Sequence, residues 1–340
     1  MKKRIFALVI SGIMCISLAA CSTGNSSSSS GSSSSSNSDS SSSSSGTSVD
    51  MRAKIATNQP GQSWMLLGST LSEYLKGTMT LSVEPGSTYG NILTTNTNET
   101  QFGITAQTSL GSALGGIRYF EPHGAQEEVT FVASLYRHYL RGLTTNPDIK
   151  TWADLKGKSV CFGPAGGESF DYNPLILSYY GLNEGDYEVK VMPFSDAIEA
   201  MKNGQLDAIL NCSPVPYAIF DDLAISDPNA HMIQLSKESA DRLASEWDGF
   251  DYVEFDFEDA WEYEKPAYSP YQQITVVANK DTPDEVVYEL LKCMYERYDD
   301  LCAVLPTMAQ IGGPENYVDN PANVPVHPGA EKFYKEMGLM

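Results

Sequence analysis

The chain has 340 residues, of which 43 are acidic and 22 basic, so its formal net charge at pH 7 is −21. This excess of negative charge repels nucleic-acid phosphates and anionic lipid headgroups, which argues against a nucleic-acid partner and against broad electrostatic contact with a membrane surface. The length suits two domains better than one, because single hydrophobic cores stop growing near ~250–300 residues.

Residues 1–20 have the pattern of an export signal. Three basic residues at positions 2–4 precede an uncharged run that ends in small residues. The run is too short for a membrane-spanning helix and is typical of a secretory signal peptide. Because Cys21 follows the small residues directly, the segment also resembles a bacterial lipobox, which implies that Cys21 is acylated and becomes the mature N-terminus.

Residues 21–49 read as a flexible linker. Serine occupies 19 of the 27 positions from 22 to 48, and such a tract cannot bury enough apolar surface to fold. We therefore expect a folded part that is lipid-anchored through Cys21 on the extracytoplasmic face of the cell membrane. The alternative is a cleaved export signal followed by a low-complexity tail.

The folded part begins with strands that alternate with helices. Apolar runs at residues 54–57, 79–84 and 102–106 predict three strands. Between the first two, leucines recur every four residues after Ser63, a candidate N-cap, and Gly77 ends the pattern. A polar helix is expected between the second and third strands. This alternation predicts a parallel sheet.

The same pattern repeats further along the chain. Runs at residues 159–163, 188–191 and 206–211 predict three more strands. Pro174 should delay or kink the helix after the first of them, and Ser195 should cap the helix after the second. Two such systems in tandem predict two similar α/β lobes.

Two apolar runs are candidates for crossings between the lobes. They are residues 130–140 and residues 274–278, and the second follows an acidic and aromatic insertion at 246–271. If both runs cross, the chain leaves the first lobe, builds the second and returns, and a final helix over 284–300 packs on the first lobe. Two crossings make a hinge, and ligands commonly bind between such lobes, outside the carboxyl ends of the strands.

The predicted fold is therefore α/β, with two lobes of mainly parallel sheet joined by two hinge crossovers. Residues 50–138 and 275–340 are expected to form lobe I, and residues 139–274 lobe II.

Two loops are the first candidates for a ligand site, because each follows a strand, contains glycine and opens a helix. Such a turn leaves free N–H donors at the positive end of a helix, which suits an anionic or polar small molecule. Each turn alone is equally well explained as a tight connection, but one in each lobe favours binding. The candidate ligand-binding residues in these loops are Gln62, Ser63, Trp64, Gly166, Gly167, Glu168 and Ser169.

Other strand ends are expected to face the same cleft. Ser87 and Thr88 follow the second strand, Gln107 the third, and Ser213 and Pro214 the last strand of lobe II. Gln107 has the alternative role of capping the following helix.

The first crossover also carries Arg137, His138 and Arg141. These side chains could supply positive charge for a carboxylate, but pairing with the many surface acids is the expectation.

No catalytic or metal-binding motif is present. The sequence contains no HExxH, GxSxG, SxxK or GxxxxGK[ST] pattern, and its four histidines are scattered. Acidic pairs such as Asp221-Asp222 and Asp299-Asp300 read as a solvated face. We expect no enzyme activity, no metal and no cofactor. The folded part holds four scattered cysteines, for which an exported protein permits disulfides but reduced structural thiols are expected: Cys161, Cys212, Cys293 and Cys302.

The order of several short blocks resembles the solute-binding proteins of tripartite ATP-independent periplasmic (TRAP) transporters of the TAXI type. Each block is weak alone, but their order and spacing are specific over roughly residues 53–338. The blocks are Val83-Glu84-Pro85-Gly86-Ser87, Phe102-Gly103-Ile104-Thr105-Ala106-Gln107, Trp152-Ala153-Asp154-Leu155-Lys156-Gly157, Gly163-Pro164-Ala165-Gly166-Gly167 and Asn203-Gly204-Gln205-Leu206-Asp207-Ala208.

The resemblance implies a type II periplasmic-binding-protein fold that closes on a small organic acid or amino-acid-like solute. It also implies delivery of that solute to the membrane permease subunits of an ion-coupled transporter, by a receptor that acts as a monomer. The same fold serves as the substrate receptor of ABC importers, which is the nearest alternative. An extracytoplasmic enzyme and a sensory or adhesive lipoprotein using the acidic segment 246–264 are alternatives of other classes.

Overall fold

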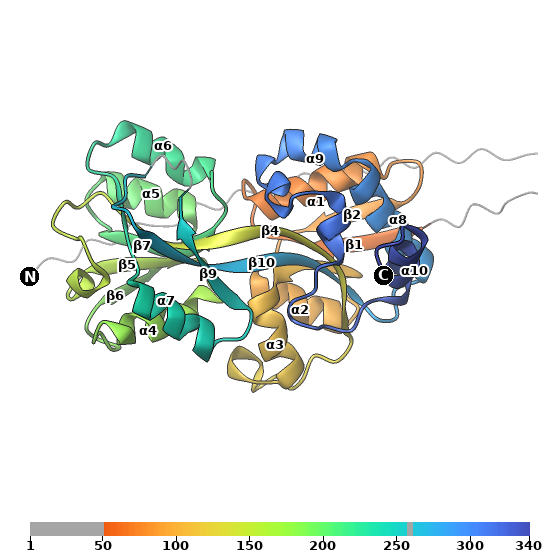
Figure 1. Cartoon of the computed structure of the whole chain (residues 1–340), viewed down its shortest axis with the longest axis horizontal. Coiled ribbons are helices and arrows are strands. Elements are labelled where there is room, and N and C mark those ends of the chain that lie inside the picture. Colours follow the sequence, from red (N-terminus) through yellow and green to blue (C-terminus); the bar gives the residue numbers. More distant parts are fainter. Residues whose placement is uncertain (1–50, 257–260) are drawn as a thin grey trace, which may run out of the picture. The chain divides into compact units, whose positions relative to one another are not determined.

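The computed structural model describes residues 51–256 and 261–340 (Figure 1). The expected signal peptide at 1–20, the acylated Cys21 and the linker at 21–49 lie outside the described residues. The described part of the chain forms one compact α/β unit. None of the helices in these residues has both the length and the apolar character that crossing a bilayer requires.

The elements of the described residues alternate as the sequence predicts. The strands are β1 (Arg52–Ala56), β2 (Thr80–Glu84), β3 (Phe102–Ala106), β4 (Val129–Thr144), β5 (Ser159–Gly163), β6 (Glu188–Val191), β7 (Ala208–Ser213), β8 (His231–Ile233), β9 (Phe250–Phe255) and β10 (Ala267–Asn279). The α-helices are α1 (Ser63–Tyr74), α2 (Thr88–Asn96), α3 (Gln107–Gly115), α4 (Ser169–Tyr179), α5 (Phe194–Lys202), α6 (Ala218–Ser226), α7 (Lys237–Glu246), α8 (Asp284–Glu296), α9 (Tyr298–Val304) and α10 (Pro328–Glu336). Short 3-10 helices are η1 (Arg118–Phe120), η2 (Trp152–Leu155), η3 (Pro306–Ile311) and η4 (Pro314–Val318).

The strands form one mixed sheet in the order β2-β1-β3-β10-β4-β7-β5-β6, with β8 beside β4 and β9 beside β10. β1 is parallel to β2 and β3, and β5 is parallel to β6 and β7. β4 and β10 run antiparallel to each other and to β7 and β3. The expected fold class is confirmed, but the sheet is mixed rather than mainly parallel. The chain leaves through β4 and returns through β10, so the two adjacent crossing strands point in opposite directions.

Separate hydrophobic cores lie at the two ends of the crossing strands. One core, which defines lobe I, packs side chains of β1, β3, β10 and the first half of β4 against α1, α8 and α10. Two others, which define lobe II, pack β5, β7 and the second half of β4 against α4 to α7. Figure 1 shows these two groups of helices at opposite ends of β4 and β10. The exact residues at which the lobes divide stay a prediction, because the described residues form one unit.

Three helix ends differ from the sequence expectation. Gln62, rather than Ser63, is the N-cap of α1. α5 begins at Phe194, one residue before the expected cap Ser195, with Pro193 at the N-cap. The expected final helix is divided into α8 and α9 at Arg297.

The first part of lobe II also differs locally. α4 begins at Ser169 without the expected delay and keeps Pro174 inside it. The acidic insertion contains β9, which pairs antiparallel with the first half of β10. β9 was not predicted, because its residues do not form an apolar run. It is an edge strand, and its Asp251 and Glu254 side chains face solvent.

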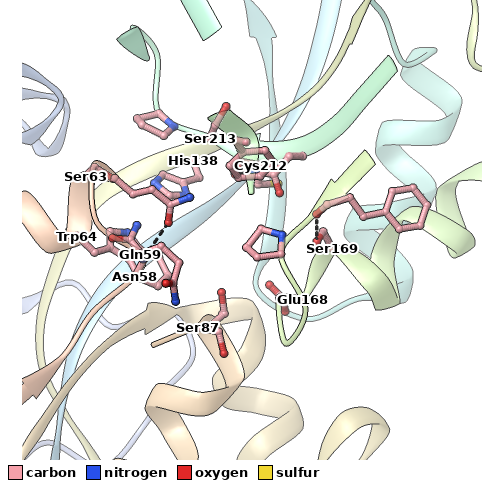
Figure 2. Close-up of a pocket in the computed structure, with 18 of the residues that line it drawn as sticks. Asn58, Gln59, Ser63, Trp64, Ser87, His138, Glu168, Ser169, Cys212 and Ser213 are labelled. Carbon is pink, nitrogen blue, oxygen red and sulfur yellow. Dashed lines mark hydrogen bonds between the residues drawn. The ribbon is translucent and has the colours of Figure 1, made fainter. Parts of the chain in front are cut away.

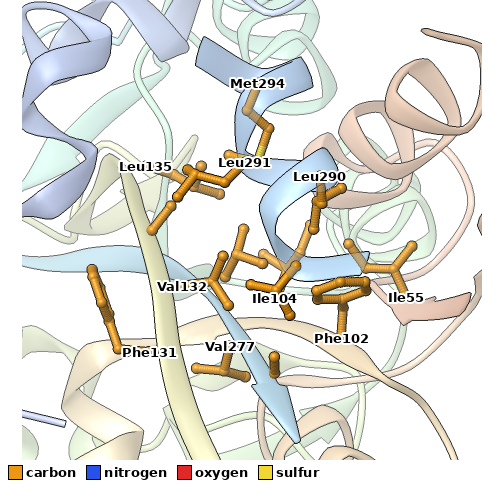
Figure 3. Close-up of a cluster of buried hydrophobic side chains, with 14 of the residues drawn as sticks. Ile55, Phe102, Ile104, Phe131, Val132, Leu135, Val277, Leu290, Leu291 and Met294 are labelled. Carbon is orange, nitrogen blue, oxygen red and sulfur yellow. The ribbon is translucent and has the colours of Figure 1, made fainter. Parts of the chain in front are cut away.

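The core of lobe I gives the first prediction. Leu290 of α8 is fully buried, and Figure 3 shows it pointing toward Phe102 and Ile104. Replacing Leu290 by alanine removes buried apolar surface and leaves a cavity, so we expect a loss of about 2–5 kcal/mol in the free energy of unfolding. Urea denaturation followed by circular dichroism measures it. The control is Leu66→Ala, because Leu66 is 44% exposed and should change stability by only about 0.5 kcal/mol. If both variants change the free energy of unfolding equally, Leu290 is not part of a buried core.

Candidate functional site

A pocket with a cavity volume of ≈ 90 Å³ lies between the two lobes (Figure 2). Its walls come from the last residues of β5 and β7 and from the segments that follow β1, β2, β5, β6 and β7, together with one residue from each crossing strand. The lining residues are Asn58, Gln59, Gln62, Ser63, Trp64, Gly86, Ser87, Thr88, His138, Phe162, Pro164, Gly167, Glu168, Ser169, Tyr172, Phe194, Asn211, Cys212, Ser213, Pro214, Tyr217 and Gln272. The carboxyl ends of the parallel strands in both lobes therefore meet at one place, as the topology requires.

Most of the sequence candidates line this pocket. They are Gln62, Ser63, Trp64, Ser87, Thr88, Gly167, Glu168, Ser169, Ser213 and Pro214. Whether they bind a ligand stays a prediction.

Two candidates, Gln107 and Gly166, are not among the lining residues. Gln107 is buried in lobe I, where its amide donates to Ser134 Oγ (2.8 Å) and accepts from Ala322 N (3.0 Å). It therefore holds the C-terminal segment rather than a cleft ligand. Gly166 has a φ of +80°, and a Cβ at this position would lie 2.9 Å from Ser87 Oγ. Glycine here permits the close approach of the two lobes.

The sequence interpretation missed the aromatic wall of lobe II. Phe162 lies at the end of β5, Phe194 begins α5, and Tyr172 and Tyr217 complete the wall. In the sequence these residues look like ordinary core positions, because they also pack in the hydrophobic cores of lobe II. They can be told apart from ordinary core residues only in the folded structure, where the ends of distant strands come together around the pocket.

Trp64 and His138 form the wall contributed by lobe I and β4. Their rings are stacked, with centroids 5.9 Å apart and an interplanar angle of 18°. Burial, assisted by the nearby charge of Arg141, lowers the pKa of His138 to about 3, so its imidazole is neutral near pH 7. Among the described residues, neither Trp64 Nε1 nor His138 Nε2 has a hydrogen-bond partner, although both atoms are buried.

Arg141 is buried, and its guanidinium contacts the end of β7 beside the pocket. Its Nη2 donates to Ser213 Oγ (2.8 Å) and to the carbonyl oxygen of Pro214 (3.1 Å). The Ser213 oxygen accepts from the guanidinium, so its own hydroxyl hydrogen is available to another acceptor. Arg137 instead stacks its guanidinium 4.1 Å from the ring centroid of Tyr271.

Among the described residues of the lining, Glu168 is the one acidic side chain. It is buried between the lobes, and this burial raises the pKa of its carboxyl group to about 8, although hydrogen bonding to Thr108 and Ser109 acts in the opposite direction. Glu168 Oε2 lies 2.7 Å from Thr108 Oγ1, and the same Thr108 oxygen lies 2.7 Å from Gln272 Oε1. The carboxyl group of lobe II is thus linked to a helix of lobe I and to a crossing strand.

Further contacts join the lobes around the pocket. Tyr89 of α2 donates its hydroxyl hydrogen to Asp171 and its backbone N–H to the Gly166 carbonyl. Trp247 Nε1 donates to the Thr108 carbonyl oxygen (3.3 Å). On another side, Gln310 Nε2 donates to the Val215 carbonyl oxygen (2.6 Å). These bonds hold the lobes together in a closed arrangement.

The comparisons with known proteins agree with this architecture. The model of the NMT1-like family matches residues 55–338, so the chain belongs to that family. A solved structure of a protein from Bordetella bronchiseptica RB50 has 13% identity and a TM-score of 0.54, over 85% of this chain and 98% of that one. This likeness concerns the fold alone.

Two further solved structures are less similar. The alkanesulfonate-binding protein SsuA from Xanthomonas axonopodis pv. citri, bound to MOPS, has 14% identity and a TM-score of 0.48, over 81% of this chain and 84% of that one. The amino acid ABC transporter substrate-binding protein AbpA from Streptococcus pneumoniae, bound to L-arginine, has 12% identity and a TM-score of 0.42, over 79% and 96%.

The cysteines give a prediction about chemical reactivity. All four in the described residues are free thiols, which confirms the expectation of reduced cysteines. Burial raises the pKa of all three thiols Cys161, Cys212 and Cys302, but only Cys302 is partly exposed and so within reach of a reagent. The thiolate is the reactive form. In a short iodoacetamide pulse at pH 7.5, peptide mapping should therefore find Cys302 modified and Cys161 and Cys212 unmodified until the chain is denatured. Labelling of native Cys212 as fast as Cys302 would contradict its burial.

Proposed function

We propose that the protein is an extracytoplasmic solute-binding receptor of a TAXI-type TRAP transporter, without enzyme activity. The observation that carries the proposal is the pocket between the lobes, into which both lobes place buried polar groups. Trp64 Nε1 and His138 Nε2 on one side and Glu168 Oε1 on the other have no hydrogen-bond partner of ordinary length within residues 51–256 and 261–340. An unpaired buried polar atom is costly, so a ligand that satisfies atoms of both lobes stabilises the closed form.

The mechanism is closure about the two crossing strands. β4 and β10 are the strands that connect the lobes within the sheet, so bending in them opens the pocket without disturbing either core. The contacts of Tyr89, Thr108 and Gln310 with lobe II form only when the lobes meet. A bound solute adds its own hydrogen bonds to these contacts and shifts the population toward the closed form.

The pocket chemistry supports a small solute with an anionic group. The Ser213 hydroxyl, backed by the buried guanidinium of Arg141, is a charge-assisted donor for a carboxylate. Phe194, Tyr172 and Trp64 offer apolar faces for a short carbon chain. A small organic acid or amino-acid-like solute satisfies both features.

The transporter class and the location are also part of this proposal. The ordered sequence blocks favour delivery to an ion-coupled TRAP permease by a monomeric receptor that is anchored to the cell membrane through acylated Cys21. Uptake that collapses when ion gradients are dissipated, while ATP is maintained, supports TRAP coupling. Uptake that follows ATP alone identifies an ABC importer.

Solute binding is the first test of the proposal. We expect the melting temperature of the purified protein to rise with at least one small organic acid or amino acid at millimolar concentration, because a ligand that binds only the folded chain adds RT ln(1 + [L]/Kd) to its stability. Native mass spectrometry of the freshly purified protein should show the same solute class. Trp64→Ala should abolish the shift, whereas Leu66→Ala, on the neighbouring exposed position, should keep it. If the protein is stable and no such solute raises its melting temperature, the receptor proposal is wrong.

Closure gives a separate prediction about affinity. Tyr89→Phe removes the hydroxyl that donates to Asp171 across the lobes while keeping the buried ring. A hydrogen bond to a charged group contributes about 1.5–3 kcal/mol, so we expect the Kd for the solute found above to rise about tenfold, chiefly through faster dissociation. Isothermal titration and stopped-flow fluorescence measure this. Tyr119→Phe is the matched control, because the half-exposed Tyr119 ring stacks on Tyr89 at 4.4 Å. Unchanged affinity in Tyr89→Phe would show that this contact does not contribute to closure.

A further inference from the structure

The link between Glu168, Thr108 and Gln272 contains two short oxygen–oxygen contacts, and each of them needs a hydrogen. Thr108 Oγ1 lies 2.7 Å from Glu168 Oε2 and 2.7 Å from Gln272 Oε1, and all three side chains are buried. A threonine hydroxyl has one hydrogen, so it can donate to only one of these two oxygens. The other short contact needs a hydrogen from its own side.

A protonated Glu168 supplies that hydrogen. The carboxyl O–H then donates to Thr108 Oγ1, and the Thr108 hydroxyl donates to Gln272 Oε1, so every short contact contains one hydrogen. The opposite arrangement, with the Gln272 amide turned over so that it donates to Thr108, leaves a charged carboxylate buried between the lobes. The cost of burying a charge disfavours that arrangement, and the raised pKa of Glu168 agrees with the neutral form.

The second carboxyl oxygen then determines what the pocket accepts. Glu168 Oε1 is buried and accepts no hydrogen bond of ordinary length in the part of the chain that the structure describes, although the Ser109 hydroxyl is near enough to influence the pKa. In the protonated carboxyl group this oxygen is a carbonyl acceptor. Figure 2 shows Glu168 on the opposite side of the pocket from Ser213. The described lining contains no lysine or arginine that could receive a second anionic group there.

We propose that Glu168 is a specificity-determining residue, which keeps its proton in the closed form and presents Oε1 to a hydrogen-bond donor of the solute. The site therefore takes a small monocarboxylate whose far end carries an N–H or O–H group, with its carboxylate at Ser213. It discriminates against dicarboxylates, because the second carboxylate of such a solute has only hydrogen-bond acceptors and Glu168 Oε1 is itself an acceptor. This inference rests on the proposed receptor function and deepens it.

Other titratable groups surround Glu168 and belong to the same electrostatic environment. Asp171 on its own helix and Arg118 of η1 act on its carboxyl group in opposite directions. The charge of Glu168 in turn acts on groups of α2, α4 and β7, namely Tyr89, Tyr172 and Cys212. Because burial raises the pKa of all three, they are neutral in the pH range in which Glu168 titrates.

Matched ligands test the specificity directly. The probes are succinamate against succinate and glutaramate against glutarate, which differ only in a terminal amide or carboxylate, together with β-alanine and γ-aminobutyrate. We expect the tightest amide or amine probe to bind the wild-type protein at least tenfold more tightly than the dicarboxylate of equal length, by isothermal titration at pH 7. A dicarboxylate that binds equally or more tightly overturns the inference, and so does a panel in which no donor-bearing probe binds.

The variant Glu168→Gln tests the proton. Glutamine copies the shape and hydrogen-bond pattern of the protonated acid, with Nε2 donating to Thr108, but it does not titrate. An acid whose pKa is raised in the folded chain loses stability as pH rises from its unfolded value near 4.5 to about 8. The wild-type protein should therefore lose stability over this range, and Glu168→Gln should not. The melting temperature of Glu168→Gln minus that of the wild type should be at least about 4 °C larger at pH 8.5 than at pH 5.

Glu238→Gln is the control for this comparison, because Glu238 is exposed in the first turn of α7. Its melting temperature should follow that of the wild type at every pH. A constant difference between Glu168→Gln and wild type from pH 5 to pH 8.5 would show that Glu168 is charged, and would overturn the inference. Binding of dicarboxylates alone would do the same while leaving the receptor function intact.

Discussion

The pairing of β4 with β10 is the constraint on which the rest of this structure depends. The two strands run antiparallel from Asn279 opposite Val129 to Gln273 opposite Arg137, and each continues into lobe II. Because one strand carries the chain out and the other carries it back, lobe II is an insertion with its own cores. The parallel strands of both lobes then direct their carboxyl ends to the same gap. The pocket is a consequence of this connectivity.

Desolvation gives this gap its chemistry. The buried polar groups at this gap are closed off from water, so each must be paired, neutral or left at a cost. The structure uses all three outcomes. Arg141 is paired with Ser213 and Pro214, His138 is neutral because burial lowers its pKa, and Glu168 keeps one oxygen without an ordinary hydrogen bond. The unsatisfied groups are the ones that a solute can complete.

Much of the candidate site was predictable because it is local in the sequence. A strand followed by a glycine turn and a helix is visible in a single stretch, and the segments around Gly61 and Gly166 both lead into the pocket lining. Gln107 was mistaken because its position at a strand end resembles the others, whereas its amide is already satisfied by Ser134 and Ala322. The Ala322 contact joins residues more than two hundred positions apart, which no local pattern reports.

The sequence by itself determined the alternation of strands and helices, the two crossing segments and the loops that open helices, because these features follow from periodicity and turn chemistry within a few residues. Only the tertiary structure decided which side chains are sealed between the lobes. The aromatic wall, the buried Arg141 and the sharing of Thr108 by Glu168 and Gln272 arise from distant segments brought together. Burial and proton sharing are properties of that assembled environment, and no single stretch of the chain contains them.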